Sequence, residues 1–249
     1  MRKMTKQDFF RSFKNQAYVN QLEKIERKFE AMHNSTTNTT ELTIYGVIGD
    51  SWWEDSISAS DIDEALKNTT GDILIYLNSP GGSAPDGIAI FNRLIDHKEK
   101  HNAKVPVRVD GWACSAASLL PAAADDVVMG LGSMLMIHEA STIVWGTKRD
   151  MRKEADVLEQ LEEGIIDIYM TKANVSREEI RKMVDDETWF SAQRAIEIGF
   201  ATSTAASNKD DEITQLRTQL TNLQNEFENY KNQEPLPPVN TGSKRRVLF

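Results

Sequence analysis

One stretch of this chain limits the fold more than any other: a short apolar run that breaks into a glycine-containing loop. Residues 73–77 run Ile-Leu-Ile-Tyr-Leu, and Ser79-Pro-Gly-Gly82 follows almost at once. A short apolar run bounded by turn residues predicts a buried β-strand. Paired glycines let backbone N–H groups turn outward and approach a ligand closely. We therefore expect a buried strand that ends in a loop able to stabilise negative charge.

Two residues further along the chain carry chemistry that fits this loop. Ser115 opens a predicted small-residue helix over 115–124, and His138 follows a predicted apolar strand over 134–137. A serine can attack a carbonyl while a histidine accepts its proton. Taken alone, Ser115 is more simply explained as a helix N-cap, and a single histidine as a buried structural residue. The loop, the serine and the histidine together favour a serine hydrolase.

Strand and helix patterns alternate from residue 42 to residue 198, which predicts an α/β fold with mostly parallel strands. The expected strands are 42–48, 73–77, 105–109, 127–129 and 134–137, and the expected helices include 60–67, 88–95, 115–124, 148–173 and 191–198. Ser176-Arg-Glu-Glu179 has the capping-box pattern of a helix start. Gly199 stands where a glycine is expected just after a helix.

The combination resembles the proteolytic subunit of the Clp protease (the ClpP-type family), most closely its phage and prophage members that act in head maturation. Four motifs carry the resemblance: Leu77-Asn-Ser-Pro-Gly-Gly82, Val109-Asp-Gly-Trp-Ala-Cys-Ser-Ala-Ala-Ser118, Met136-Ile-His138 and Glu187-Thr-Trp-Phe-Ser-Ala192. It covers residues 41–203. The resemblance implies a superhelix of β-β-α units shared with the crotonases, a protein substrate and a homo-oligomeric ring. It also implies that the 148–173 helix is the handle that joins two rings.

The resemblance also implies the roles of individual residues. Ser115 would be the nucleophile of an endopeptidase and His138 its general base. Glu187 occupies the position of the family's aspartate and would be the third member, as in hydrolases with a Ser-His-Glu triad. Asp185 is the alternative acid.

The oxyanion hole implied by the same alignment consists of the backbone N–H groups of Gly82 and Ala116. Cys114 precedes the nucleophile position and is interpreted as a small buried hydrophobe. Glu139 stands where many family members have glutamine, in a region that contacts the opposing ring. The sequence therefore does not decide between one ring and two.

The domain organisation follows from where the pattern changes. We predict a helical arm and polar linker over 1–40, a ClpP-like serine protease domain over 41–206, a short coiled coil over 207–232 and a disordered tail over 233–249. The coiled-coil seam follows heptad spacing and consists of Ile213, Leu216, Leu220, Leu223, Phe227 and Tyr230. Because an isolated helix of this length is marginal in water, the seam predicts a partner, for which a capsid or scaffold protein is one candidate.

Composition narrows the remaining function classes. A net charge of −9 argues against a nucleic-acid role, and no apolar run approaches a membrane span. The single cysteine and the lack of a secretory signal at the N-terminus favour a cytoplasmic protein, in the bacterial host if the gene is phage-encoded. No Walker A motif and no Cys/His cluster is present, so we expect no cofactor and no metal. Any ATP dependence would come from a separate unfoldase.

Three other functions compete with the endopeptidase. A crotonase-type acyl-CoA enzyme shares the fold but needs no serine nucleophile. An α/β-hydrolase would require a G-x-S-x-G elbow, which the residues around Ser115 lack. An inactive structural homologue, in which Glu187 marks a decayed triad and the coiled coil carries the function, stays open on the sequence alone.

Overall fold

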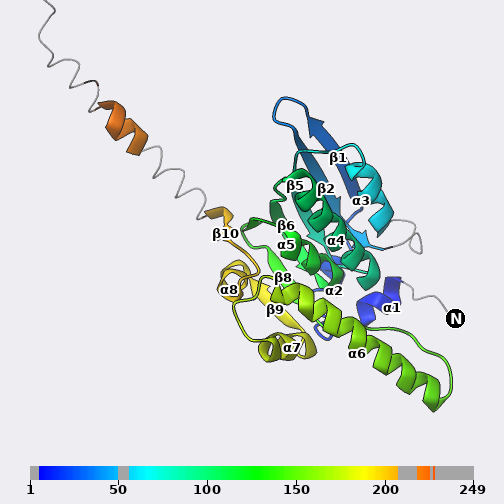
Figure 1. The fold of residues 1–249 in the computed structure, drawn as a ribbon. Coiled ribbons are helices and arrows are strands. Elements are labelled where there is room, and N and C mark those ends of the chain that lie inside the picture. Colours follow the sequence, from blue (N-terminus) through cyan, green and yellow to red (C-terminus); the bar gives the residue numbers. More distant parts are fainter. Residues whose placement is uncertain (1–5, 50–55, 207–217, 225–226, 228–249) are drawn as a thin grey trace, which may run out of the picture. The chain divides into compact units, whose positions relative to one another are not determined.

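An eight-stranded sheet forms the centre of the first of two compact units, Met1–Ser207 and Asn208–Phe249 (Figure 1). The structure, a computed structural model, describes residues 6–49, 56–206, 218–224 and 227. The sheet strands are β1 (Lys28–Asn34), β2 (Thr39–Tyr45), β5 (Asp72–Ser79), β6 (Val107–Cys114), β7 (Val127–Met129), β8 (Met134–Ile137), β9 (Thr188–Ser191) and β10 (Ser203–Thr204). A small parallel pair, β3 (Val47–Ile48) and β4 (Ser56–Ile57), lies beside it.

The centre of the sheet is parallel, as the alternating sequence pattern predicts. Strands β2, β5, β6 and β7 pair in parallel, whereas β1 and β9 are antiparallel to their neighbours. Strand β6 is shared by two partners: residues 107–109 pair with β7, and residues 112–114 pair with β8. The second half of β6 therefore ends beside the end of β8.

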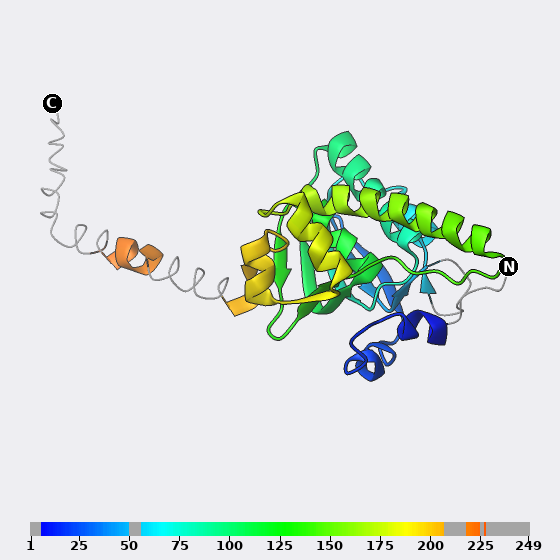
Figure 2. The same ribbon diagram turned by 90° about the horizontal axis from the view of Figure 1, so that it is seen from below.

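Helices cover one face of the sheet, and residues 6–25, which we call the arm, cover part of the other (Figure 2). Side chains alternate between the two faces along the strands. Leu135 and Ile137 of β8 lie in the main core, while Met136 between them packs with the arm. The described helices are α1 (Lys6–Arg11), α2 (Val19–Leu22), α3 (Ala59–Leu66), α4 (Ala84–His101), α5 (Leu119–Ala123), α6 (Lys148–Met170), α7 (Arg177–Asp185) and α8 (Ala192–Ile198).

The local signals at helix ends are confirmed. Ser176 and Glu179 form the expected capping box at the start of α7. Gly199 ends α8 with a φ of 94°, a left-handed conformation that glycine adopts without strain. Among the described residues, no helix is long and apolar enough to span a membrane.

The helical arm and polar linker expected over 1–40 are only partly correct. Residues 28–34 form β1, which pairs along its whole length with β2 through a hairpin, so only residues before β1 belong to the arm. Six of the seven β1 residues are exposed. The side chains of β1 contribute few contacts: Phe29 packs against the main core, and a ring nitrogen of His33 lies 3.1 Å from the Thr40 hydroxyl of β2.

The expected helix over 115–124 is only partly correct. Residues Ser115–Ser118 form a single 3₁₀ turn, and the α-helix α5 starts at Leu119. Ser115 has a φ of 54°, which is outside the helical range. It therefore occupies a sharp bend after β6 and is not the N-cap of an α-helix.

The second unit is described only over 218–224, a helical segment, and at Phe227. Of the predicted seam, Leu220, Leu223 and Phe227 are described, and all three side chains are more than half exposed. Ile213, Leu216 and Tyr230 lie outside the described residues, as does the tail predicted over 233–249. The coiled coil stays a prediction.

Candidate active site

The paired ends of β6 and β8 bring Ser115 and His138 together. Cys114 lies opposite Met136 in the parallel register, so Ser115 leaves β6 beside the strand that leads to His138. The Nε2 atom of His138 lies 2.8 Å from the Oγ atom of Ser115. This distance allows a hydrogen bond through which the imidazole can accept the hydroxyl proton.

The backbone around Ser115 is held in an uncommon conformation by a close contact with the Gly-Gly loop. A Cβ atom on Gly81 would lie 2.4 Å from the carbonyl oxygen of Cys114 and 2.5 Å from the Cβ atom of Ser115. No side chain fits there. A non-glycine residue at positive φ is uncommon, and such residues are found preferentially at functional sites. The loop and the bend after β6 therefore fit each other through backbone contact.

The two predicted oxyanion donors lie close to this bend. Gly82 lines the same cleft as Ser115 and His138. Ala116 is the residue after Ser115, and its nitrogen is 2.9 Å from the position that a Cβ on Gly81 would take. Gly82 and Ala116 remain the predicted donors.

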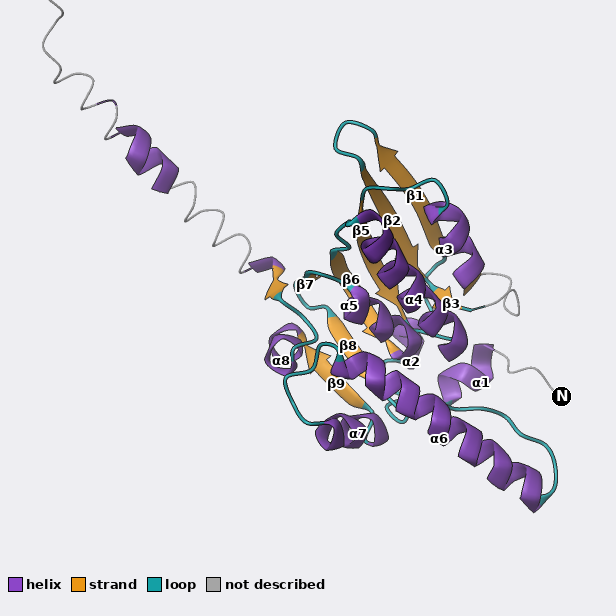
Figure 3. Ribbon diagram, viewed as in Figure 1, coloured by secondary structure: helices purple, strands orange, loops and turns teal. Residues whose placement is uncertain are grey.

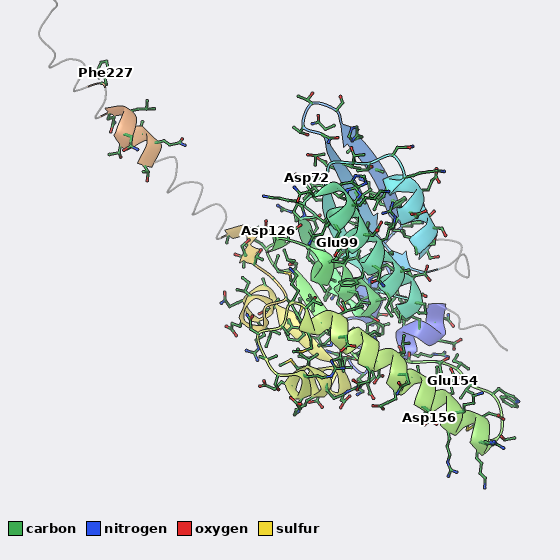
Figure 4. The ribbon with its side chains drawn as sticks, viewed as in Figure 1. Asp72, Glu99, Asp126, Glu154, Asp156 and Phe227 are labelled. Atoms are coloured by element: carbon green, nitrogen blue, oxygen red, sulfur yellow. The ribbon has the colours of Figure 1, made fainter. Side chains whose placement is uncertain are left out.

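A cleft of about 470 Å³ opens beside Ser115 and His138. One wall is the apolar side of α6, with Val157, Leu158 and Leu161, and Phe9 of the arm lines the cleft as well. The carboxylates at its border belong to Asp86, Glu139 and Glu154, of which Glu154 lies on α6 (Figure 4). Figure 3 shows the long loop after His138 that leads to the start of α6. The cleft thus combines an apolar wall with carboxylate side chains in its lining.

Glu187, the predicted third member, is buried next to this pair but bonds to the arm. Its side chain accepts hydrogen bonds from the backbone N–H groups of Lys14 and Asn15, the latter at 2.8 Å, and from the indole N–H of Trp189 at 3.2 Å. Its negative charge raises the pKa of His138. Among the described hydrogen bonds, none joins Glu187 to His138. Its influence on the imidazole is electrostatic in this structure.

The alternative acid, Asp185, is exposed at the end of α7. Its backbone carbonyl accepts a hydrogen bond from the Lys14 ammonium. Its neighbour Asp186 pairs with Lys182. Of the described carboxylates on this side of the site, Glu187 is the one that is buried and whose charge raises the pKa of His138.

The environment of His138 favours the neutral imidazole. Burial lowers the pKa of His138 to about 4, and the charge of Lys14 lowers it further, while Glu187 and Glu139 oppose this shift. A neutral imidazole is the form that can act as a base. At neutral pH the ring is therefore ready to accept a proton.

Several residues of the site had no functional prediction. Phe13 packs on the His138 ring, with ring centroids 5.1 Å apart. Ser118, interpreted from the sequence as a packing residue, is buried. Its hydroxyl donates a 2.6 Å hydrogen bond to the carbonyl of Ser115 and lies 2.6 Å from the hydroxyl of Tyr169. The spacing of the arm's phenylalanines indicated a docking segment, but no local pattern indicated the docking place. Cys114 is fully buried, as predicted.

Among the described residues, no group of three or more His, Cys, Asp and Glu side chains could hold a metal ion.

Comparison with known proteins gives one consistent family. Residues 62–208 match the Clp protease family. ATP-dependent Clp protease proteolytic subunit 1 of Protochlamydia amoebophila is 30% identical over 146 residues, 57% of this chain and 69% of that protein. Subunit 2 of Treponema denticola is 26% identical over 185 residues, 73% of this chain and 89% of that protein. ATP-dependent Clp protease proteolytic subunit 1 of Streptomyces avermitilis is 30% identical over 175 residues, which are 67% of this chain and 78% of that protein.

Proposed function

Because this chain belongs to the Clp protease family and is a serine-type peptidase, we propose that it is an endopeptidase whose nucleophile is Ser115 and whose general base is His138. The observation that carries the assignment is the 2.8 Å distance between the Ser115 hydroxyl and the Nε2 atom of His138. The imidazole of His138, whose pKa burial lowers to about 4, is neutral at neutral pH and so has a free lone pair to accept the hydroxyl proton.

The proposed reaction proceeds through an acyl-enzyme. The Oγ atom of Ser115 attacks the peptide carbonyl carbon while its proton passes to His138, and the carbonyl becomes an oxyanion that the amides of Gly82 and Ala116 stabilise. The tetrahedral intermediate collapses, the C–N bond breaks, and His138 returns the proton to the leaving amine. Water then hydrolyses the ester by the same steps. Glu187 stabilises the imidazolium through its charge.

The proposed substrates are capsid or scaffold proteins of an assembling phage head. This part of the proposal is supported by the sequence resemblance to phage and prophage members of the family and by a C-terminal segment, residues 209–249, beyond the family match. The β-β-α superhelix, a homo-oligomeric ring and an unfoldase partner are the finer features that the family suggests. The C-terminal seam would tether the protease to the assembly.

Labelling with a fluorophosphonate probe tests the enzyme assignment. We expect modification at Ser115, located by peptide mapping, with loss in His138→Ala. Ser133→Ala is the matched control, because Ser133 is also a buried serine but its hydroxyl bonds to the Gly130 carbonyl away from His138. A folded, assembled sample that does not label would identify an inactive homologue.

Removal of residues 207–249 tests the tether separately. We expect the shortened protein to keep its labelling rate and to lose co-sedimentation with assembling capsids. Normal co-sedimentation of the shortened protein would exclude the tether while leaving the peptidase assignment intact. Turnover of an acyl-CoA thioester that survives Ser115→Ala would favour the crotonase alternative instead.

A further inference from the structure

The arm docks on the face of the sheet that carries Ser115 and His138. The arm residues buried there share an apolar cluster with the ends of β6 and β8, formed by Phe9, Phe10, Phe13, Val19, Leu22, Cys114 and Met136. Each of these side chains is at most 9% exposed. Burial on this scale contributes stabilisation of about 25 cal/mol per Å² of apolar surface, so the arm is a fixed part of the unit.

One arm residue contacts the imidazole directly. The ring of Phe13 lies 5.1 Å from that of His138, with an angle of 34° between the planes. Side-chain alternation along β8 explains the contact, since Met136 faces the arm and His138 is two residues further on. The Phe13 ring thereby covers one side of His138 and excludes water from it.

The next two arm residues hold the acid. The backbone N–H groups of Lys14 and Asn15 both bond to the carboxylate of Glu187. Tyr18 fixes this part of the arm by packing against the rings of Trp112 and Trp189, at 5.5 and 5.1 Å. A carboxylate that accepts several N–H bonds from fixed backbone and side-chain donors keeps its orientation.

We propose that Phe13, Lys14 and Asn15 are positioning residues of the active site, with the Phe13 ring setting the orientation and dryness of His138 and the two amides fixing the carboxylate of Glu187. The inference rests on the peptidase function proposed above. The docked arm does not block the site, because the cleft beside Ser115 stays open and Phe9 of the arm lines it.

The charges that face His138 come from several elements. Lys14 belongs to the arm, Glu139 to the loop after β8 and Glu187 to the start of β9. Asp86 of α4 and Glu154 of α6 border the cleft. Replacing Phe13 removes none of these charges, so a change in the titration of His138 reports the loss of the apolar cover as long as the arm stays docked.

The test follows the titration of His138 in the full-length chain with Phe13→Ala. Histidine NMR gives its midpoint, and the labelling rate at Ser115 between pH 4 and pH 8 gives the same quantity independently. We expect the midpoint of Phe13→Ala to rise by at least about one pH unit toward the ordinary value of about 6.5. Val19→Ala, a truncation on the same arm in α2, should leave it unchanged.

The single cysteine reports whether the arm is still docked. Cys114 lies under the arm and is fully buried, so a thiol reagent reaches it only when the arm leaves. If Cys114 becomes reactive in Phe13→Ala, the Phe13→Leu variant is used for the test instead, because leucine keeps apolar bulk without the flat ring. With Cys114 protected, we expect a rise of about half a pH unit in Phe13→Leu.

Each outcome decides something. An unchanged midpoint in a variant with a docked arm overturns the positioning role, and so does an equal rise in Val19→Ala, which would assign the effect to docking as a whole. Wild-type protein that fails to label at Ser115 refutes the peptidase, yet the NMR midpoint still tests the contact between Phe13 and His138.

Discussion

Two parts of the site are built in different ways. Ser115 and His138 are brought together by the register of neighbouring parallel strands, whereas Glu187 is held by backbone amides of the arm. The first arrangement uses residues 23 positions apart in the chain, and the second uses residues 172 and 173 positions apart. The proposed nucleophile and base are therefore held by the core of the fold, while the proposed acid is held by a peripheral segment.

Replacement of the sheet-held nucleophile should have the largest effect. For Ser115→Ala we expect peptidase activity to fall by at least about 10³-fold, because the covalent step is lost. Activity measured on a chromogenic peptide checks this, with Ser133→Ala as the folded control. Activity that persists in Ser115→Ala would show that Ser115 is not the nucleophile.

Disturbing the close contact between Gly81 and the backbone at Ser115 should have the next largest effect on activity. Gly81→Ala places a Cβ atom against Cys114 and Ser115, and the resulting shift should lower the labelling rate about 10²-fold, as expected for displacement of a reacting group by about 1 Å. Gly132→Ala is the matched control, since Gly132 also has positive φ but no atom within 4 Å of the added Cβ. It should cost about 1–2 kcal/mol of stability and leave the rate unchanged. Equal rates in the two variants would show that the loop does not constrain Ser115.

We expect a smaller effect on kcat when Glu187, the carboxylate held by the arm, is replaced. Glu187→Gln removes the charge, and we expect about a 30-fold loss of kcat, roughly 2 kcal/mol. A directly hydrogen-bonded acid is worth about 10⁴-fold, so the size of the loss measures how Glu187 acts. A loss near the larger value would mean that Glu187 bonds to His138 when substrate is bound. Asp185→Asn, on the exposed neighbour, should retain full kcat.

The cover over His138 also predicts a modest dependence of stability on pH. The unfolded chain binds a proton at His138 below about pH 6.5, but the folded chain does so only near pH 4. Stability should therefore rise as pH increases from about 4 to about 6.5, by at most about 1.4 kcal/mol per pH unit. Denaturant unfolding of wild type and His138→Ala isolates this contribution as a difference in slope. A steeper slope in His138→Ala would contradict a lowered pKa.

The same contrast explains how much could be predicted from the sequence. His138 directly follows a predicted apolar strand, and the local pattern places it at a strand end. The strand predicted over 105–109 instead continues to Cys114, so its pattern alone did not place Ser115 at its end. The strands over 127–129 and 134–137 have the predicted bounds. The α/β class is confirmed for the same reason, because alternating strands and helices have few arrangements available.

The contacts of the arm could not be predicted in this way. The spacing of Phe9, Phe10 and Phe13 indicates an apolar side, but not which surface it covers. Strand β1 was missed because six of its seven residues are exposed and its sequence carries no sustained apolar alternation. The bend at Ser115 was missed because a run of small residues is compatible with a 3₁₀ turn as well as with an α-helix. In each case the deciding interaction is made by backbone atoms or by residues distant in the chain.

The position of the arm at the start of the chain also governs when the site can form during synthesis. Asn15 and its partner Glu187 are separated by 172 residues. At a translation rate of about 5–20 residues per second, the ribosome needs roughly 10–30 s to synthesise this interval. Ser115 and His138 are synthesised within this interval, whereas the carboxylate of Glu187 follows only at its end. A growing subunit therefore lacks the carboxylate that the arm holds until nearly the whole domain has been synthesised.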